Sequence, residues 1–137
     1  VKVINADIMK TDLLKIIEEE FEGLEVAVCA NLPYYITSPI IMLLLEKRLP
    51  IKSITVMVQK EAADRLCAEL GTREAGAVTV AVRYFSTPKM LFKVSRGSFM
   101  PPPNVDSCVI RLDINETTPV GVEDEEFFIN VATGCLL

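Results

Sequence analysis

Apolar residues in the first half of the chain alternate between strand-like runs and helix-like spacing. Short β-prone runs occupy residues 2–5, 25–30 and 53–59. Apolar positions recur at helical spacing over residues 12–22, 39–47 and 60–70. Ser38 followed by Pro39 is a typical start for the second of these helices. The β-α-β-α-β-α order predicts an α/β protein with a parallel sheet covered by helices, and the nearly continuous apolar strands predict burial on both faces.

The second half of the chain has a less regular pattern. Residues 75–85 fit a strand by the alternation of their valines and a helix by the spacing of their other apolar residues. Residues 90–94 and 105–114 read as strands, and the three prolines within 99–104 exclude a helix or a central strand there. The remainder is expected to hold an acidic linker over 115–126 and the start of a helix over 127–137.

The composition fits one globular domain and excludes several classes of protein. The chain has 137 residues, of which 50% are hydrophobic and 24% charged, enough to bury a core. No apolar run approaches the roughly 18 residues that a membrane span needs, so we expect no membrane partner. The net charge of −5 argues against binding to nucleic acid by bulk electrostatics, although it allows a local basic rim.

The reactive residue types narrow the chemistry further. Histidine is absent, which excludes Ser-His-Asp and Cys-His catalysis and every His-ligated metal site. The four cysteines are widely spaced and form no C-x-x-C pair, so we expect no metal. Three of the four lie in apolar runs, which favours free, buried thiols in a reducing cytoplasm.

The segment Asn31-Leu32-Pro33-Tyr34 carries the most chemical information. It follows an expected buried strand directly, at the sheet edge where ligands bind in open α/β folds. The Asn31 amide oxygen and a main-chain carbonyl at Leu32 or Pro33 could accept two hydrogen bonds from an exocyclic amine. Tyr34 offers a flat face for stacking a planar group. The alternative is a proline turn that ends a strand, with Tyr34 and its neighbour Tyr35 in the core.

Four further residues are candidates for a binding site. Asp7 follows the first expected strand and could accept a hydrogen bond from a nucleoside cofactor, or it could simply cap a helix. Phe99 precedes the proline-stiffened loop and could form the second wall of a base-stacking slot, or it could be a core residue. Lys93 and Arg96 belong to a small basic cluster that could contact a phosphate backbone or be ordinary solvated surface.

Several motifs, in order along the chain, resemble one enzyme family. NLPYYITSPI (31–40) resembles the catalytic motif of the KsgA-type ribosomal RNA adenine N6,N6-dimethyltransferases. VMVQKEAADRL (56–66) and FKVSRGSFMPPPNVDSCVIRLD (92–113) are also similar to that family. INAD (4–7) resembles its G-D-A segment, with the Asp kept and the Gly replaced. The resemblance extends over about residues 2–130 and favours a helix for residues 75–85.

The resemblance implies an S-adenosylmethionine-dependent enzyme with a Rossmann-like methyltransferase fold, its sheet mostly parallel with an antiparallel C-terminal strand. Asp7 would then hydrogen-bond the cofactor adenine, and Asn31 would lie between cofactor and target amine. Asn31 and the Leu32–Pro33 backbone would grip the adenine N6, while Tyr34 and Phe99 would stack the extruded base. The implied partner is ribosomal RNA in a precursor of the small subunit.

The chain also departs from the family pattern. The family's Gly-rich cofactor loop has no counterpart among the six glycines. We therefore expect a fragment, with residues 1–114 forming the back half of the methyltransferase domain. Residues 115–137 would form a linker and the start of the small helical C-terminal domain.

Three other functions stay open on the sequence alone. One is an Erm-type large-subunit ribosomal RNA methyltransferase, although the YYITSPI continuation and the V-D-S strand look more KsgA-like. Another is a non-enzymatic RNA-binding or transcription factor on the same fold. The third is a glutamine or DNA-adenine methyltransferase, which the segment 99–107 makes less fitting.

Overall fold

The computed structural model describes residues 1–116 and 121–135 and contains one mixed sheet with helices packed against it. The strands are β1 (Ala27–Asn31), β2 (Ser53–Gln59), β3 (Ser86–Val94) and β4 (Ser107–Ile114). The α-helices are α1 (Leu13–Glu20), α2 (Thr37–Glu46), α3 (Lys60–Leu66), α4 (Ala77–Phe85) and α5 (Glu125–Cys135). Single 3₁₀ turns form η1 (Ile8–Lys10), η2 (Tyr34–Ile36) and η3 (Arg96–Ser98). Within the described residues, no helix is long and apolar enough to cross a bilayer.

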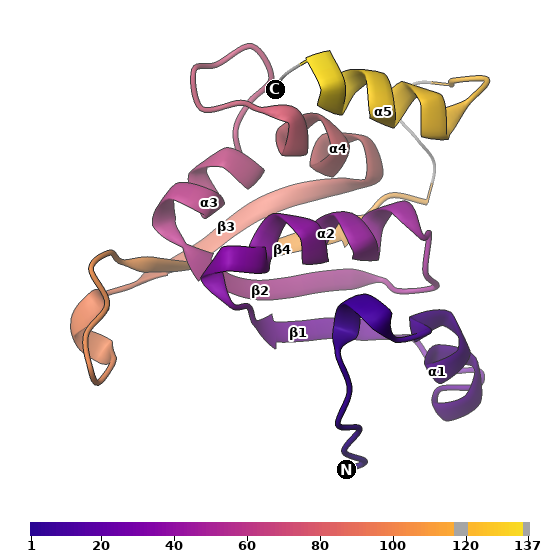
Figure 1. The fold of residues 1–137 in the computed structure, drawn as a ribbon, viewed down its shortest axis with the longest axis horizontal. Coiled ribbons are helices and arrows are strands. Elements are labelled where there is room, and N and C mark those ends of the chain that lie inside the picture. Colours follow the sequence, from indigo (N-terminus) through magenta and orange to yellow (C-terminus); the bar gives the residue numbers. More distant parts are fainter. Residues whose placement is uncertain (117–120, 136–137) are drawn as a thin grey trace.

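The sheet has the strand order β1-β2-β4-β3 (Figure 1). β1 and β2 pair in parallel, whereas β4 pairs antiparallel with both β2 and β3. Because β2 and β3 both run opposite to β4, three of the four strands point in one direction and the last strand points against them. This arrangement confirms the expected direction of the strands, including the antiparallel C-terminal strand.

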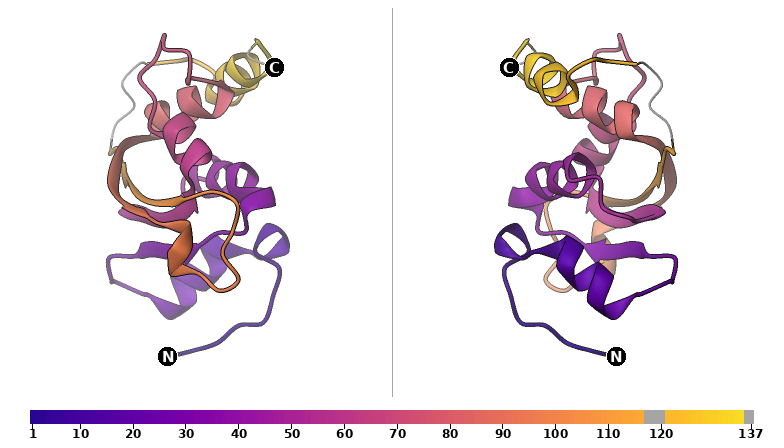
Figure 2. Two further views of the ribbon diagram at one scale, coloured as in Figure 1. Left: turned by 90° about the vertical axis from the view of Figure 1, so that its left-hand side faces the viewer. Right: turned by 90° about the vertical axis from the view of Figure 1, so that its right-hand side faces the viewer.

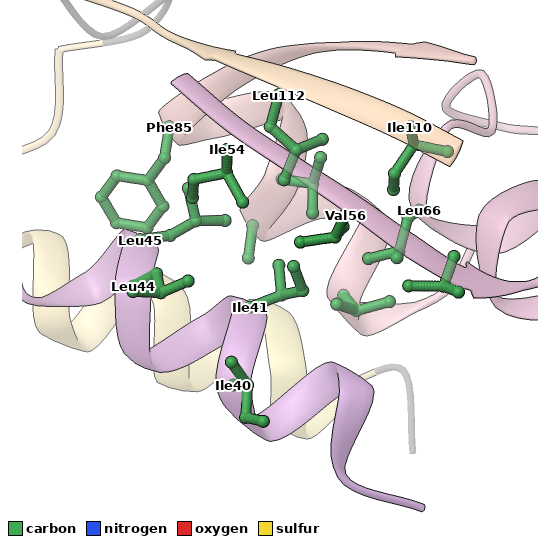
Figure 3. Packing of buried hydrophobic residues seen from close by; sticks show 14 of the residues in the cluster. Ile40, Ile41, Leu44, Leu45, Ile54, Val56, Leu66, Phe85, Ile110 and Leu112 are labelled. Atoms are coloured by element: carbon green, nitrogen blue, oxygen red, sulfur yellow. The ribbon is translucent and has the colours of Figure 1, made fainter. Parts of the chain in front are cut away.

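Helices α2, α3 and α4 lie on the same face of the curved sheet, and α5 packs on the outer side of α4 (Figures 1 and 2). Alternate residues of the two central strands point toward these helices and are fully buried (Figure 3). The buried set includes Ile54 and Val56 of β2, Ile110 and Leu112 of β4, and Ile41 of α2. A core of this kind fixes β2 and β4 most firmly, so residues at their ends hold defined positions.

Most of residues 75–85 form a helix, α4, as the resemblance favoured. α4 buries Val78, Ala81, Val82 and Phe85 against the core, which the helical spacing allows and a strand would not. Its first turn is held by the Thr79 hydroxyl, which accepts from the Gly76 N–H at 2.9 Å and donates to a carbonyl of α3 at 2.6 Å. Valine alternation in this segment was therefore a misleading strand signal.

The strand expected over residues 2–5 is wrong. Those residues form no ladder with any described strand, and Val3 is 86% exposed. In Figure 1 this segment extends away from the sheet. A β-prone composition needs a neighbouring backbone to hydrogen-bond, and here none of the described strands lies beside it.

The expectation of strands buried on both faces is also wrong for β1. β1 is the outer strand of the described sheet, and its alternate residues, Cys29 among them, are exposed. Cys67 is half-buried and Cys108 fully buried, so the expected burial of the thiols holds only in part. The side chain of Cys135 lies outside the described residues.

Two helices begin or end at residues other than those that the sequence pattern predicted. Ser38 does not cap α2, because that helix begins one residue earlier, at Thr37. The helix expected over 60–70 ends at Leu66, and Leu70 is 57% exposed. Its end is stabilised by Arg83 of α4, whose guanidinium donates to the carbonyls of Cys67 and Ala68 at 3.0 Å each. Such a cap comes from a distant residue, which helical spacing cannot reveal.

The helix expected over residues 127–137 begins two residues earlier, within the linker expected over 115–126. β4 ends at Ile114 and α5 begins at Glu125, while the expected linker includes residues 117–120, which lie outside the described residues. The Asp124 carboxylate accepts from the Phe127 N–H at 2.9 Å and so caps α5.

Candidate active site

The candidate site is built on the turn that follows β1. Asn31 is the last residue of this strand and is exposed. Leu32 is 5% exposed, and its N–H donates to the Met57 carbonyl of β2 at 3.3 Å. The buried Leu32 side chain and this hydrogen bond anchor the turn to the parallel pair, at the carboxyl end of both strands.

The turn itself uses the carbonyl of Pro33. That oxygen accepts from the Ile36 N–H at 3.2 Å and from the buried Thr37 hydroxyl at 3.1 Å. A carbonyl oxygen has two lone pairs, so both are engaged. Of the two main-chain acceptors left open by the sequence, the geometry therefore favours Leu32 over Pro33 as the partner of the Asn31 amide oxygen.

The two tyrosines do not belong to the core, contrary to the alternative weighed for this segment. Tyr34 is 37% exposed and Tyr35 is 85% exposed. The Tyr34 hydroxyl lies 2.9 Å from the hydroxyl of Ser107, the first residue of β4. The ring of Tyr34 is thus tethered at its tip while part of its surface faces solvent. Ser107 was missed as a site residue, and its only sequence signal was membership of the V-D-S motif.

Phe99 lies in the long connection between β3 and β4, which projects from one end of the sheet in Figure 1. Phe99 directly follows η3 and is half-buried. The connection is tied at its base, because the Arg96 N–H donates to the Asp106 carboxylate at 2.9 Å. Among the described residues, no aromatic ring pair joins Phe99 to Tyr34. A stacking slot between these two rings therefore stays a prediction.

Asp7 takes the capping role weighed for it. Its carboxylate accepts from the Met9 N–H at 2.9 Å at the start of η1. The residue is exposed, so the carboxylate is also accessible to a ligand. η1 and η2 both pack against α2, which places the segments that follow Asp7 and Asn31 beside the same helix.

Cavities lie at the N-terminal end of α3, and one of them adjoins the two tyrosines. One of about 220 Å³ is lined by Tyr34, Tyr35 and Arg65, among other residues. Another of about 400 Å³ includes Lys60 and Arg96. The Asp64 carboxylate, which accepts from Lys60 at 2.8 Å, raises the pKa of that lysine. The cations near the site are thus partly neutralised by neighbouring acids.

The two basic candidates lie at different places in this region. Arg96 lines the second cavity and donates to the Asn104 carbonyl at 3.4 Å. Lys93 is exposed on β3, opposite Cys108 of β4. Among the described side chains, no group of three or more Cys, Asp or Glu residues could hold a metal ion.

A family model described as ribosomal RNA adenine dimethylase matches residues 1–137. Ribosomal RNA small subunit methyltransferase A of Alkaliphilus oremlandii is 54% identical over 131 residues, which is 96% of this chain and 46% of the relative. The protein of the same name from Geobacillus thermodenitrificans is 52% identical over 132 residues, 96% of this chain and 45% of the relative. The chain spans about half the length of these curated relatives.

Two solved structures share the fold. A dimethyladenosine transferase from Plasmodium falciparum superposes with a TM-score of 0.79 at 30% identity, covering 98% of this chain and 45% of that one. The 23S rRNA methyltransferase ErmE gives a TM-score of 0.72 at 26% identity, covering 96% and 49%. These likenesses confirm the Rossmann-like α/β fold expected from the sequence.

Proposed function

Because the chain belongs to the ribosomal RNA adenine dimethylase family, we propose that the protein transfers methyl groups from S-adenosylmethionine to the N6 atoms of adenosines in small-subunit ribosomal RNA. Each target adenine would receive two methyl groups. The observation that carries this proposal is the turn after β1. There Asn31 is exposed, the Pro33 carbonyl is already engaged and the partly exposed Tyr34 is tethered by its hydroxyl, so we assign the two acceptors for the amine to the Asn31 amide and the Leu32 carbonyl.

The two acceptors address the difficulty of the reaction. The lone pair of an adenine N6 is delocalised into the ring, so the amine is a poor nucleophile. Hydrogen bonds from its two N–H groups to Asn31 and Leu32 would draw the nitrogen toward tetrahedral geometry. They would also stabilise the positive charge that develops on it. No histidine base is needed, since the methylated ammonium loses its proton readily to water.

The residues present fit the adenosine end of the cofactor. Asp7 supplies an exposed carboxylate that can accept from an adenine amino group. Asn31 is also exposed, at the end of β1, and its amide can face the cofactor. Bound S-adenosylmethionine would supply an activated sulfonium methyl group. The protein's contribution is then chiefly alignment of the amine.

The aromatic residues address access to the base. An adenine must leave its stack before its N6 can enter the site, and an aromatic surface offsets part of that loss. We assign this role to Tyr34 and, from the opposite side, to Phe99. Lys93 and Arg96 would contact the phosphate backbone near the flipped nucleotide. Single-stranded or loop RNA suits such a site better than a duplex.

The same proposal covers the partner, the location and the division of the chain. The small-subunit precursor is favoured as partner because the relatives named for the small subunit are 54% and 52% identical, against 26% for the 23S rRNA enzyme. Such a substrate places the protein in the cytoplasm. Residues 1–114 would belong to the catalytic domain, and residues 115–137 would lead into a second, helical domain.

A substrate comparison tests this function directly. The protein expressed from its complete gene would be incubated with labelled S-adenosylmethionine and either precursor 30S particles or naked large-subunit RNA. We expect two methyl groups per modified adenine on the 30S particles and no label on the large-subunit RNA. Labelling of the large-subunit RNA would favour the Erm-type function, and binding to RNA without any labelling would favour a non-enzymatic factor.

A further inference from the structure

The tip of the Tyr34 side chain is held by a residue far away in the sequence. The Tyr34 Oη and Ser107 Oγ atoms lie 2.9 Å apart, and either hydroxyl can donate in this hydrogen bond. Ser107 has no exposed surface. Its neighbours in the sheet are Gln59 of β2 on one side and Val94 of β3 on the other. The anchor is therefore a buried residue at the end of an inner strand, paired on both sides.

The other end of Tyr34 is fixed as well. The Thr37 hydroxyl shares its one proton between the Pro33 carbonyl at 3.1 Å and the Tyr34 carbonyl at 3.4 Å, and Pro33 has a φ of −59°. With the backbone held by the turn and the ring tip held by Ser107, the ring has little freedom to rotate. Tyr34 as a whole residue is nevertheless 37% exposed. This is the arrangement of a preformed stacking surface rather than of a core residue.

We propose that Ser107 is a positioning residue for base stacking: it fixes the Tyr34 ring in the orientation that receives the target adenine. This inference rests on the proposed function, in which Tyr34 stacks the base. It gives the tyrosine hydroxyl a purpose that a phenylalanine could not serve.

A fixed ring would act on the rate rather than on the affinity for RNA. Ordering a mobile aromatic side chain opposes capture of the flipped base, and a ring already ordered avoids that loss. Contacts to phosphates supply most of the affinity for RNA, and they do not involve this hydrogen bond. Loss of the tether should therefore lower kcat, while the KM for RNA and the affinity for S-adenosylmethionine stay unchanged.

The test compares Ser107→Ala, Tyr34→Phe and the double variant in the protein expressed from its complete gene. Methyl transfer to precursor 30S particles would be measured, with S-adenosylmethionine binding by calorimetry used to count folded sites. We expect each single variant to lower kcat per folded site by about two- to tenfold, the usual worth of one hydrogen bond. The double variant should lose no more than either single variant, because both remove the same bond.

Ser86→Ala is the matched control. Ser86 is also the first residue of a strand, is 2% exposed, and donates its hydroxyl to the Val82 carbonyl at 2.7 Å, away from the site. It should lose stability to a similar degree and keep the kcat of the unsubstituted protein.

Three results would overturn the inference. They are an unchanged kcat for Ser107→Ala, a loss in the double variant equal to the product of the single losses, and an equal loss for Ser86→Ala. If Asn31→Ala abolishes methyl transfer while Ser107→Ala is fully active, only the positioning role fails. If Asn31→Ala keeps full activity, the proposed function fails with it.

Discussion

The contact between α5 and the rest of the fold depends on a small network centred on Arg48. The Arg48 guanidinium forms an ion pair with both carboxylate oxygens of Glu125, the first residue of α5. The Tyr84 hydroxyl donates to the same carboxylate at 3.1 Å, and the guanidinium carbon lies 5.3 Å from the centre of the Phe85 ring. We predict that Arg48→Ala loosens α5 without unfolding the sheet.

The magnitude follows from the exposure of the pair. The Arg48 and Glu125 side chains are 45% and 32% exposed, so the ion pair belongs in the range of about 0.2–1 kcal/mol for surface pairs. The cation–π contact lies between Arg48 and Phe85 of α4, so it persists when α5 opens and adds nothing to this figure. Arg48 has a φ of +46°, and alanine keeps that backbone penalty, so the substitution reports the side chain alone. The ion pair of about 0.2–1 kcal/mol corresponds to roughly 1.4- to 5-fold in an opening equilibrium.

Hydrogen exchange of backbone amides measures this opening directly. Amides of α5 should exchange roughly 1.4- to 5-fold faster in Arg48→Ala at pH 7, and those of β2 should not change. Arg111→Ala is the control, because Arg111 is also 45% exposed and pairs with Asp113 on β4 instead. Unchanged exchange in α5, or equal acceleration in the Arg111 variant, would show that Arg48 does not hold α5 in place.

The effect should also depend on pH. The hydrogen bond from Arg48 is the main cause that lowers the pKa of Glu125 from its ordinary value of 4.5. A group with a lowered folded-state pKa stabilises the fold fully above its unfolded value and loses that contribution as the pH falls through the folded value. The difference between the two proteins should therefore be complete at pH 7 and shrink below pH 4.5. An equal difference at pH 3 would contradict this assignment.

Two further predictions concern the thiols and the core. Burial raises the pKa of Cys67 to about 11. Iodoacetamide at pH 8 should therefore label the exposed Cys29 well before Cys67, which peptide mass spectrometry can detect. Preferential labelling of Cys67 would contradict this expectation. Ile110→Ala, at a fully buried position, should lower the free energy of unfolding in urea by about 2–5 kcal/mol, whereas Phe92→Ala, 57% exposed, should lower it by less than about 1 kcal/mol. Similar losses for the two variants would show that the core is placed wrongly.

The sequence predicted those parts of the fold that depend on local spacing. The β-prone run 53–59 and the helical spacing in 12–22 led to β2 and α1, because both signals lie in residues that are close together in the sequence. Residues 2–5 show where this reasoning stops. Their composition suits a strand, but strand formation depends on a partner backbone, about which local composition says nothing.

The candidate site, like the fold, could be predicted from the sequence only in part. The motif after β1 predicted Asn31 and Tyr34 from residue types alone. The choice of Leu32 over Pro33 needed the hydrogen bonds of the turn, and the role of Ser107 needed a contact across 73 residues of sequence. Contacts of this range arise from the packed sheet, so only the folded chain reveals them.

We propose that Asn31 holds the amine to be methylated, and the rate of single-turnover methyl transfer by Asn31→Ala measures this role. Loss of one preorganised acceptor should lower the rate on precursor 30S particles by about 10²- to 10³-fold. Binding of the particles should stay as it is in the unsubstituted protein. A rate within threefold (about 0.7 kcal/mol) of the unsubstituted protein would contradict the account.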